Sequence, residues 1–347
     1  MSPPKIQPIA YNGKIYVSTA EGLYAFNANN GTVDWVYPTA LPLGHSPTVV
    51  DINGIPTAFV GGFDKQIHAI HADTGKAILG YTPYTAGAGF ETNPLVVNNT
   101  IYAGNRDGIF YAFNAQTGAK VWEYKTGGPI HFSAAYDKNT IYVASNDNHA
   151  YALNANTGTL VWKSPKLEYT AGFHTFWPVI YTSKDTGAAY VVFTGAENYR
   201  HAEDNILEQM DQTHFNPGCR WIEGFECAPG LLWPTSTAKK NDSYWAPETK
   251  LFNISKYNSR FSRSSILEYH EQYPHRRVVY VLNRNTGKEV TFDANNNGKP
   301  DYLPITQAGG VTGSGNKYPP VINKLDGIYY QQTMYQGGGW IGRGDVV

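Results

Sequence analysis

Hydrophobic and polar residues alternate along most of this chain, in short runs that are separated by Gly, Asn and Asp. Alternation with a period of two is typical of β-strands that bury one face, and Gly and Asn favour the tight turns between strands. Five segments repeat one order: an alternating strand, a polar turn that ends in Gly, and a second strand. They are residues 23–35, 67–79, 110–122, 150–162 and 279–291.

The turn glycines set the period of this repeat. Gly31, Gly75, Gly118 and Gly158 follow one another at intervals of 44, 43 and 40 residues. This is the length of a propeller blade that is built from four short strands. Gly287 follows only after 129 further residues. We therefore expect a large insertion between two strands of the fifth blade, at about residues 199–276, lying over the active face.

The repeat resembles that of the pyrroloquinoline-quinone (PQQ) enzymes, whose hallmark is a strand, an Ala-x-x-Thr-Gly turn and a closing Trp, as in AQTGAKVW and ANTGTLVW. The resemblance covers nearly the whole chain outside the insertion. It implies an all-β fold: a PQQ-like β-propeller of four-stranded antiparallel blades, with five complete blades and part of a sixth here. Because about seven or eight blades are usual in such proteins, we expect residues 1–347 to form one propeller domain that is truncated at one or both ends.

One face of this propeller is expected to carry a binding funnel. Successive connections in an antiparallel blade alternate between its two ends. The hairpin after the second strand and the link to the next blade therefore share a face, opposite the near-identical Thr-Gly turns. The links bring His45, Glu91, Asn93, His131, His174 and Lys317 to this face, and the hairpins add Arg106, Asp107, Glu197 and Arg200. Such a ring indicates a ligand site, although turn formation is the alternative for most of the hairpin residues.

The chain resembles tetrathionate hydrolase of acidophilic sulfur oxidisers, an exported quinoprotein-like propeller that needs no quinone. The resemblance implies hydrolysis of a small sulfur oxyanion in the funnel. Glu91, Glu197 and Asp107 would then move the proton of the attacking water. The anionic substrate would be held by donors and protonated imidazoles, namely His45, Asn93, Arg106, His131, His174, Arg200 and Lys317.

Two other functions stay open. The segment TGAENYR resembles the Gly-Ala-Glu segment of quinone-dependent alcohol dehydrogenases, which would place the calcium-binding glutamate beside the quinone at Glu197. The sequence lacks the adjacent cysteine pair of the alcohol-oxidising enzymes, so PQQ is not the expected cofactor. The other function is that of a non-catalytic binding or scaffold propeller, such as an adhesin or an assembly factor.

A calcium loop is predicted after the last strand of the fifth blade, in DANNNGKPD. Asp293, Asn295, Asn297 and Asp301 supply oxygen ligands at positions 1, 3, 5 and 9 of the loop, and the carbonyl of Lys299 supplies position 7. Two of the four side-chain ligands are neutral, so we expect modest affinity and a structural role. An ordinary Asn- and Gly-rich loop is the alternative.

Composition narrows the partners and the compartment. The net charge is −1, charged residues are only 16% of the chain, and no basic run occurs, so nucleic acid is not an expected partner. No apolar run is long enough to span a membrane. Cys219 and Cys227 are close in sequence and favour a disulfide over two free thiols, as in a periplasmic, secreted or surface protein. The aromatic insertion is also a candidate contact in a homo-oligomer.

Overall fold

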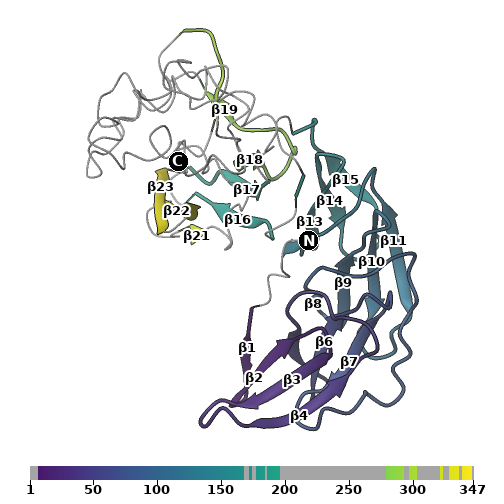
Figure 1. Cartoon of the computed structure of the whole chain (residues 1–347). Coiled ribbons are helices and arrows are strands. Elements are labelled where there is room, and N and C mark those ends of the chain that lie inside the picture. Colours follow the sequence, from purple (N-terminus) through teal and green to yellow (C-terminus); the bar gives the residue numbers. More distant parts are fainter. Residues whose placement is uncertain are drawn as a thin grey trace, which may run out of the picture. The chain divides into compact units, whose positions relative to one another are not determined.

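The computed structural model describes residues 7–167, 172–173, 177–183, 186–195, 279–292, 297–302, 321–322, 328–335 and 338–345. All regular elements in these ranges are strands (Figure 1). The chain divides into two compact units. Unit 1 comprises Met1–Leu167, Gly172–Ile180 and Arg284–Lys288, and unit 2 comprises Glu168–Ala171, Tyr181–Asn283 and Glu289–Val347.

Unit 1 contains four antiparallel sheets, which we number as blades 1 to 4 in chain order. Blade 1 consists of β1 (Ile9–Tyr11), β2 (Lys14–Ser18), β3 (Gly22–Asn27) and β4 (Val33–Pro38). Blade 2 consists of β5 (Thr48–Ile52), β6 (Ile55–Gly61) and β7 (Ile67–His71). Blade 3 consists of β8 (Leu95–Val97), β9 (Thr100–Gly104), β10 (Ile109–Asn114) and β11 (Lys120–Lys125). Blade 4 consists of β12 (Ala135–Asp137), β13 (Thr140–Ser145), β14 (His149–Asn154) and β15 (Leu160–Lys163).

Blade 5 is formed by β16 (Val179–Thr182), β17 (Ala189–Thr194) and β18 (Val279–Asn283). Thr194 pairs with Val279, so β17 and β18 are neighbours although 84 residues of sequence separate these two. Unit 2 contains the pair β19 (Thr291–Phe292) and β20 (Asp301–Tyr302), and a sheet of β21 (Val321–Ile322), β22 (Ile328–Tyr335) and β23 (Gly338–Asp345). The predicted all-β fold of antiparallel blades is confirmed. The insertion itself lies outside the described residues, and the single-domain boundaries stay a prediction.

Tryptophans on the outer strands explain the repeated Thr-Gly turn. The indole Nε1 of Trp122 donates to the carbonyl of Ala155 in the next blade at 2.9 Å. A Cβ on Gly158 would lie only 2.6 Å from that indole, and Gly158 has a φ of +71°. Only glycine can adopt this positive φ without strain and also leave room for the indole. Trp35 covers Gly75, and Trp162 covers Gly287, in the same way.

The sequence predicted four strands in every blade. Among the described residues, blade 5 has three strands and an isolated bridge between Leu282 and Glu289, and blade 2 has three strands and an isolated bridge between Ile70 and Ala77. Its outer segment carries Leu79 where blades 1, 3 and 4 carry Trp, and Leu79 is fully exposed. Tyr81 and Thr82 instead approach Gly118 of the next blade. Without an indole to dock on the neighbouring turn, the outer segment does not continue as a regular strand.

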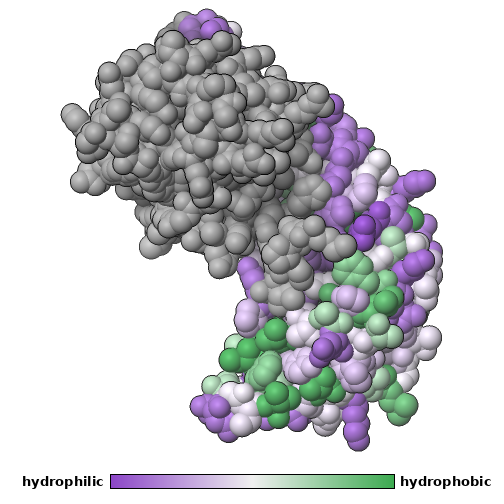
Figure 2. Space-filling model, viewed as in Figure 1, coloured by the Kyte–Doolittle hydropathy of each residue, from purple (hydrophilic) through white to green (hydrophobic). Residues whose placement is uncertain are grey.

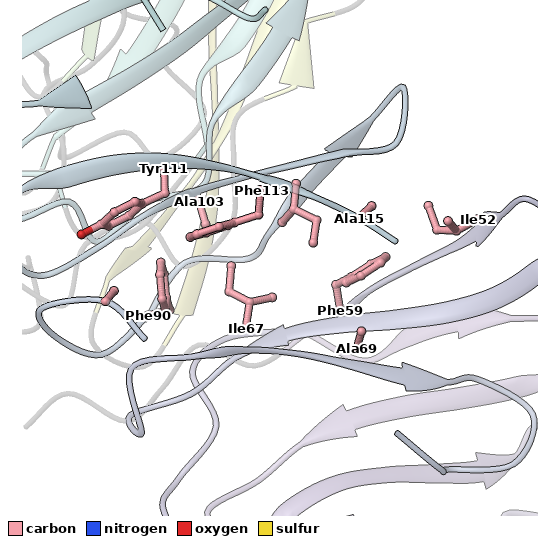
Figure 3. Packing of buried hydrophobic residues seen from close by; sticks show 11 residues of the cluster. Ile52, Phe59, Ile67, Ala69, Phe90, Ala103, Tyr111, Phe113 and Ala115 are labelled. Atoms are coloured by element: carbon pink, nitrogen blue, oxygen red, sulfur yellow. The ribbon is translucent and has the colours of Figure 1, made fainter. Parts of the chain in front are cut away.

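The core lies between the blades. Between blades 2 and 3, Phe59, Phe90 and Phe113 are each at most 2% exposed and pack with Ile67 and Tyr111 (Figure 3). Burial of each large side chain is worth about 1.5–3 kcal/mol. Exposed apolar side chains such as Val33 and Val36 lie on the edge strand β4, and Figure 2 shows hydrophobic patches at the end of the described surface where β1 to β4 lie.

Backbone hydrogen bonds define two faces of each blade. The amides of Leu43, Phe90 and Ile130, in the links between blades, donate to Thr19, Gly62 and Asn105, in the hairpins after the second strands. Links and these hairpins therefore share a face, as predicted, and we call it the funnel face. On the opposite turn face, the Thr-Gly turns contact the first hairpin of their own blade, as in the Ala155 to Asn139 bond of 2.9 Å.

Candidate functional site

The funnel face brings Glu91, Arg106 and His131 together. Phe90 and Ile130 make equivalent backbone bonds in successive links, so the residues that follow them, Glu91 and His131, occupy equivalent positions. The Oε2 atom of Glu91 lies 2.6 Å from Nδ1 of His131, and its Oε1 atom lies 3.4 Å from Nη1 of Arg106. The carboxylate of Glu91 therefore contacts two side chains. One is the imidazole of His131, from the next link, and the other is the guanidinium of Arg106, from a hairpin of blade 3.

The electrostatics of this cluster keep Glu91 ionised. The hydrogen bond with His131 lowers the pKa of the Glu91 carboxyl most, and burial opposes it. The charges of His131, Arg106 and His45 lower this pKa further, and the net direction is downward. A group with a lowered pKa stays a carboxylate even in mild acid, which suits pairing better than proton transfer.

His45 is displaced by one residue from the position predicted for it. Leu43 is the counterpart of Phe90 in the preceding link, so Gly44, and not His45, corresponds to Glu91. His45 nevertheless lies close enough to Glu91 to lower the pKa of its carboxyl. The predicted ring of matching side chains is therefore irregular at this link, because spacing alone could not fix the register.

Arg106 is the outward member of the cluster. Its side chain is 46% exposed, compared with 23% for Glu91 and 18% for His131. The guanidinium also lies over the ring of Phe63, 6.0 Å from its centroid. Two contacts thus hold a half-exposed cation in place, and Phe63 is a site residue that the sequence reasoning missed. The sequence signal that could have identified Phe63 is its position directly before Asp64 in the hairpin.

Asp107, a predicted catalytic residue, has a structural environment. Its carboxylate accepts hydrogen bonds from the amides of Gly87 and Ile109 and from the hydroxyl of Tyr111, at 3.0, 2.9 and 2.8 Å. Asp147 accepts the equivalent bonds from Gly127, His149 and Tyr151 in blade 4. The alternative of turn formation therefore accounts for the contacts of Asp107, and none of these contacts involves Glu91.

Asn93 lies two residues after Glu91, and its backbone amide is hydrogen-bonded whereas its side-chain oxygen is not. Its backbone amide donates to Oγ of Ser133 at 2.9 Å, which connects one link to the next. Its side-chain Oδ1 is buried and has no hydrogen-bond partner. A buried acceptor without a donor is costly, so Asn93 is a candidate contact for a bound molecule or water on the funnel face.

Several predicted residues lie outside the described part of the chain. They are His174, Glu197, Arg200, Lys317, Asp293, Asn295, Cys219 and Cys227. Of the predicted calcium loop, Asn297 and Lys299 are exposed, and the Lys299 amide donates to Oδ1 of Asn297 at 2.9 Å. Phe292 pairs with Asp301, which closes the loop at its base. Among the described residues, no group of His, Cys, Asp and Glu side chains is arranged to hold a metal ion, and no helix suits a membrane span.

Comparison with known proteins agrees with this architecture. Residues 54–168 and 85–197 match the family described as outer membrane protein assembly factor BamB. BamB of Shewanella oneidensis is 25% identical over 132 residues, which are 34% of this chain and 33% of that protein. The chain thus aligns with only about a third of this curated relative. Residues 54–197 therefore resemble the repeats of this family.

Solved structures extend the likeness in fold. Quinohemoprotein alcohol dehydrogenase from Comamonas testosteroni aligns with 96% of the chain and 52% of its own length, at a TM-score of 0.55 and 14% identity. BamB from Moraxella catarrhalis aligns with 55% of the chain and 58% of its own length, at a TM-score of 0.43 and 15% identity. The alcohol dehydrogenase match, together with the antiparallel blades, shows a PQQ-type β-propeller fold.

Proposed function

We propose that this protein is a non-catalytic binding propeller, which holds a protein partner on its funnel face. One observation carries the proposal. Every acidic side chain that the structure describes on this face in blades 2 to 4 is engaged with its own neighbours: Asp64 with His68, Glu91 with Arg106 and His131, Asp107 with Tyr111, and Asp147 with Tyr151. The acids therefore contribute contacts within the face, whereas its cations Arg106 and Lys65 are accessible to solvent.

The state of Glu91 supports binding over acid–base catalysis. A general acid or base works best when its pKa lies near the working pH. The His131 hydrogen bond and the surrounding charges lower the pKa of Glu91, so they move it away from neutral pH. Glu91 is therefore suited to fix the position of Arg106, which can then meet an acidic group of a partner with little loss of side-chain entropy.

The partner and compartment follow from the relatives. The matching family and the Shewanella protein are named outer membrane protein assembly factors. A protein that assists outer membrane protein assembly meets polypeptides outside the cytoplasm. We infer that this chain also works outside the cytoplasm and that its ligand is a polypeptide.

Replacement of Arg106 tests the proposal. We expect Arg106→Ala to weaken binding of an unfolded outer membrane protein, diluted from urea, by about fivefold, since losing one interfacial charge contact costs roughly 1 kcal/mol. Lys76→Ala is the matched control, because Lys76 is an exposed cation on a Thr-Gly turn of the opposite face. Equal affinities of both variants in biolayer interferometry would contradict binding through the funnel face.

The enzymatic functions predicted from sequence stay predictions. Their direct test is thiosulfate release from tetrathionate in acid, and dye reduction in the presence of quinone, calcium and an alcohol. We expect neither reaction. Turnover that is lost in Glu91→Gln would overturn the non-catalytic proposal.

A further inference from the structure

The funnel face of blade 2 carries a lysine at a backbone position where blades 3 and 4 have other residues. Lys65 directly follows the aspartate of its hairpin, as Gly108 and Asn148 do in blades 3 and 4. All three residues have a positive φ, which is +72° at Lys65, +83° at Gly108 and +63° at Asn148. Glycine and asparagine tolerate this left-handed conformation better than lysine does. Local backbone preference therefore does not explain the lysine at this position.

The ammonium group of Lys65 is exposed, and no ion pair among the described residues includes it. The neighbouring Asp64 instead lies 2.9 Å from Nε2 of His68. The backbone of Lys65 is fixed, because its amide donates to Gly62 at 3.2 Å and its carbonyl accepts from Ala86 at 2.9 Å. The hairpin thus holds Lys65 in place and leaves the N–H donors of its side chain to solvent.

Arg106 reaches the same part of the funnel face from blade 3. The carbonyl of Gly89, in the link between blades 2 and 3, accepts the Arg106 amide at 3.4 Å. A Cβ on Gly89 would lie 3.1 Å from Cα of Phe63, two residues before Lys65. The Phe63 ring lies under the Arg106 guanidinium, and Glu91 contacts only Nη1 of that group. The half-exposed guanidinium therefore keeps N–H donors for a further carboxylate.

We propose that Lys65 and Arg106, which we call the basic pair, select segments of a partner polypeptide that are rich in Asp and Glu. The inference rests on the proposed binding function and specifies the chemistry of its ligand. One carboxylate of the partner takes the remaining donors of Arg106, and another pairs with Lys65. Because the described acids of this face already contact their own neighbours, they leave these two cations to attract the partner.

Lys138 provides a matched control for the backbone conformation of Lys65. It is an exposed lysine with a φ of +43°, in the first hairpin of blade 4 on the turn face. Lys65→Asn and Lys138→Asn each remove one positive charge and introduce a residue that favours a positive φ. We expect neither variant to have a lower urea midpoint than the wild type. A difference in binding between the two variants then reflects the position of the charge.

Fluorescence anisotropy at low ionic strength tests the selection, with two labelled peptides of equal length. One peptide alternates Gly and Glu, and the other alternates Gly and Gln. We expect the wild type to bind the Glu peptide about tenfold more tightly than the Gln peptide, and Lys65→Asn to weaken binding of the Glu peptide about threefold to fivefold. Lys138→Asn should bind like the wild type. Equal affinity of the wild type for both peptides, or equal losses in both variants, would overturn the inference.

Binding of the unfolded outer membrane protein separates this inference from the proposed function. If the wild type binds that protein on the funnel face but does not prefer the Glu peptide, acidic selection is wrong and the binding propeller stands. If the wild type binds neither the protein nor either peptide, both proposals are wrong. A loss of affinity for the Glu peptide in Lys65→Asn, with unchanged affinity for the Gln peptide, supports selection by the basic pair.

Discussion

Glu91, a predicted catalytic residue, contacts the side chains of His131 and Arg106. The sequence predicted that Glu91 lies in a link between blades, and the backbone bond of Phe90 to Gly62 places this link beside the hairpins of the funnel face. The sequence could not show that His131 and Arg106 both contact its carboxylate. Those contacts bring together three loops whose register depends on the packing of the blades. The bonds of Asp107 to Gly87 and Tyr111 could not be predicted for the same reason, and its catalytic role stays a prediction.

Replacement of Glu91 should reveal its structural contribution and its pH dependence. Because the folded state lowers the pKa of Glu91, its stabilising effect is complete above the usual glutamate range and is lost as the pH falls through the lowered pKa. We expect Glu91→Gln to reduce the free energy of unfolding by about 1 kcal/mol near pH 7, and by less near pH 3. Urea unfolding at several pH values measures this difference. A constant difference at all pH values would exclude the charge of Glu91 as the cause.

At the scale of the elements, the repeat was the strongest signal. Strand alternation and the Gly and Trp positions predicted the sheets of blades 1, 3 and 4, because each residue of the motif has a local or nearest-neighbour partner. The outer strand of blade 2 was predicted wrongly from the same pattern, since Leu79 has no partner that resembles the docked Trp122. The tryptophans appeared in the sequence only as strand endings. The structure shows them as clamps between blades.

Two glycines provide a matched test of these clamps. Gly31 and Gly158 have φ values of +73° and +71°, so alanine suffers the same backbone strain at both positions. A Cβ on Gly31 meets nothing within 4 Å, whereas one on Gly158 would lie 2.6 Å from the Trp122 indole. We expect Gly31→Ala to cost about 1–2 kcal/mol and Gly158→Ala to cost about 1–3 kcal/mol more. Equal midpoints in urea would show that the indole does not hold the turn.

The calcium loop can be tested as a separate element. If Asp293, Asn295, Asn297, Asp301 and the Lys299 carbonyl bind calcium, millimolar calcium should raise the melting temperature of the chain, in keeping with a dissociation constant of about 10⁻⁴–10⁻³ M. Asp293→Asn should remove most of this increase. Asp73→Asn, in a Thr-Gly turn, is the control and should keep it. An identical calcium response in both variants would place the binding elsewhere.

At the scale of the whole molecule, fold and function have different degrees of support. The all-β blades follow from a period in the sequence, and a solved propeller aligns with 96% of the chain. Function depends on which surface contacts a partner, and no repeat period encodes that. The described acidic side chains of blades 2 to 4 on the funnel face bind their own neighbours, which is why we propose a binding propeller rather than a hydrolase.

A hydrogen-exchange footprint of the bound protein tests this central claim most directly. With an unfolded outer membrane protein as the ligand, we predict added protection in the links and hairpins of the funnel face, at residues 43–46, 62–66, 89–93, 105–108 and 127–133. The Thr-Gly turns at residues 28–32, 72–76, 115–119 and 155–159 should exchange as in the free protein. Protection confined to those turns, or no protection in a preparation that hydrolyses tetrathionate, would contradict a binding function of the funnel face.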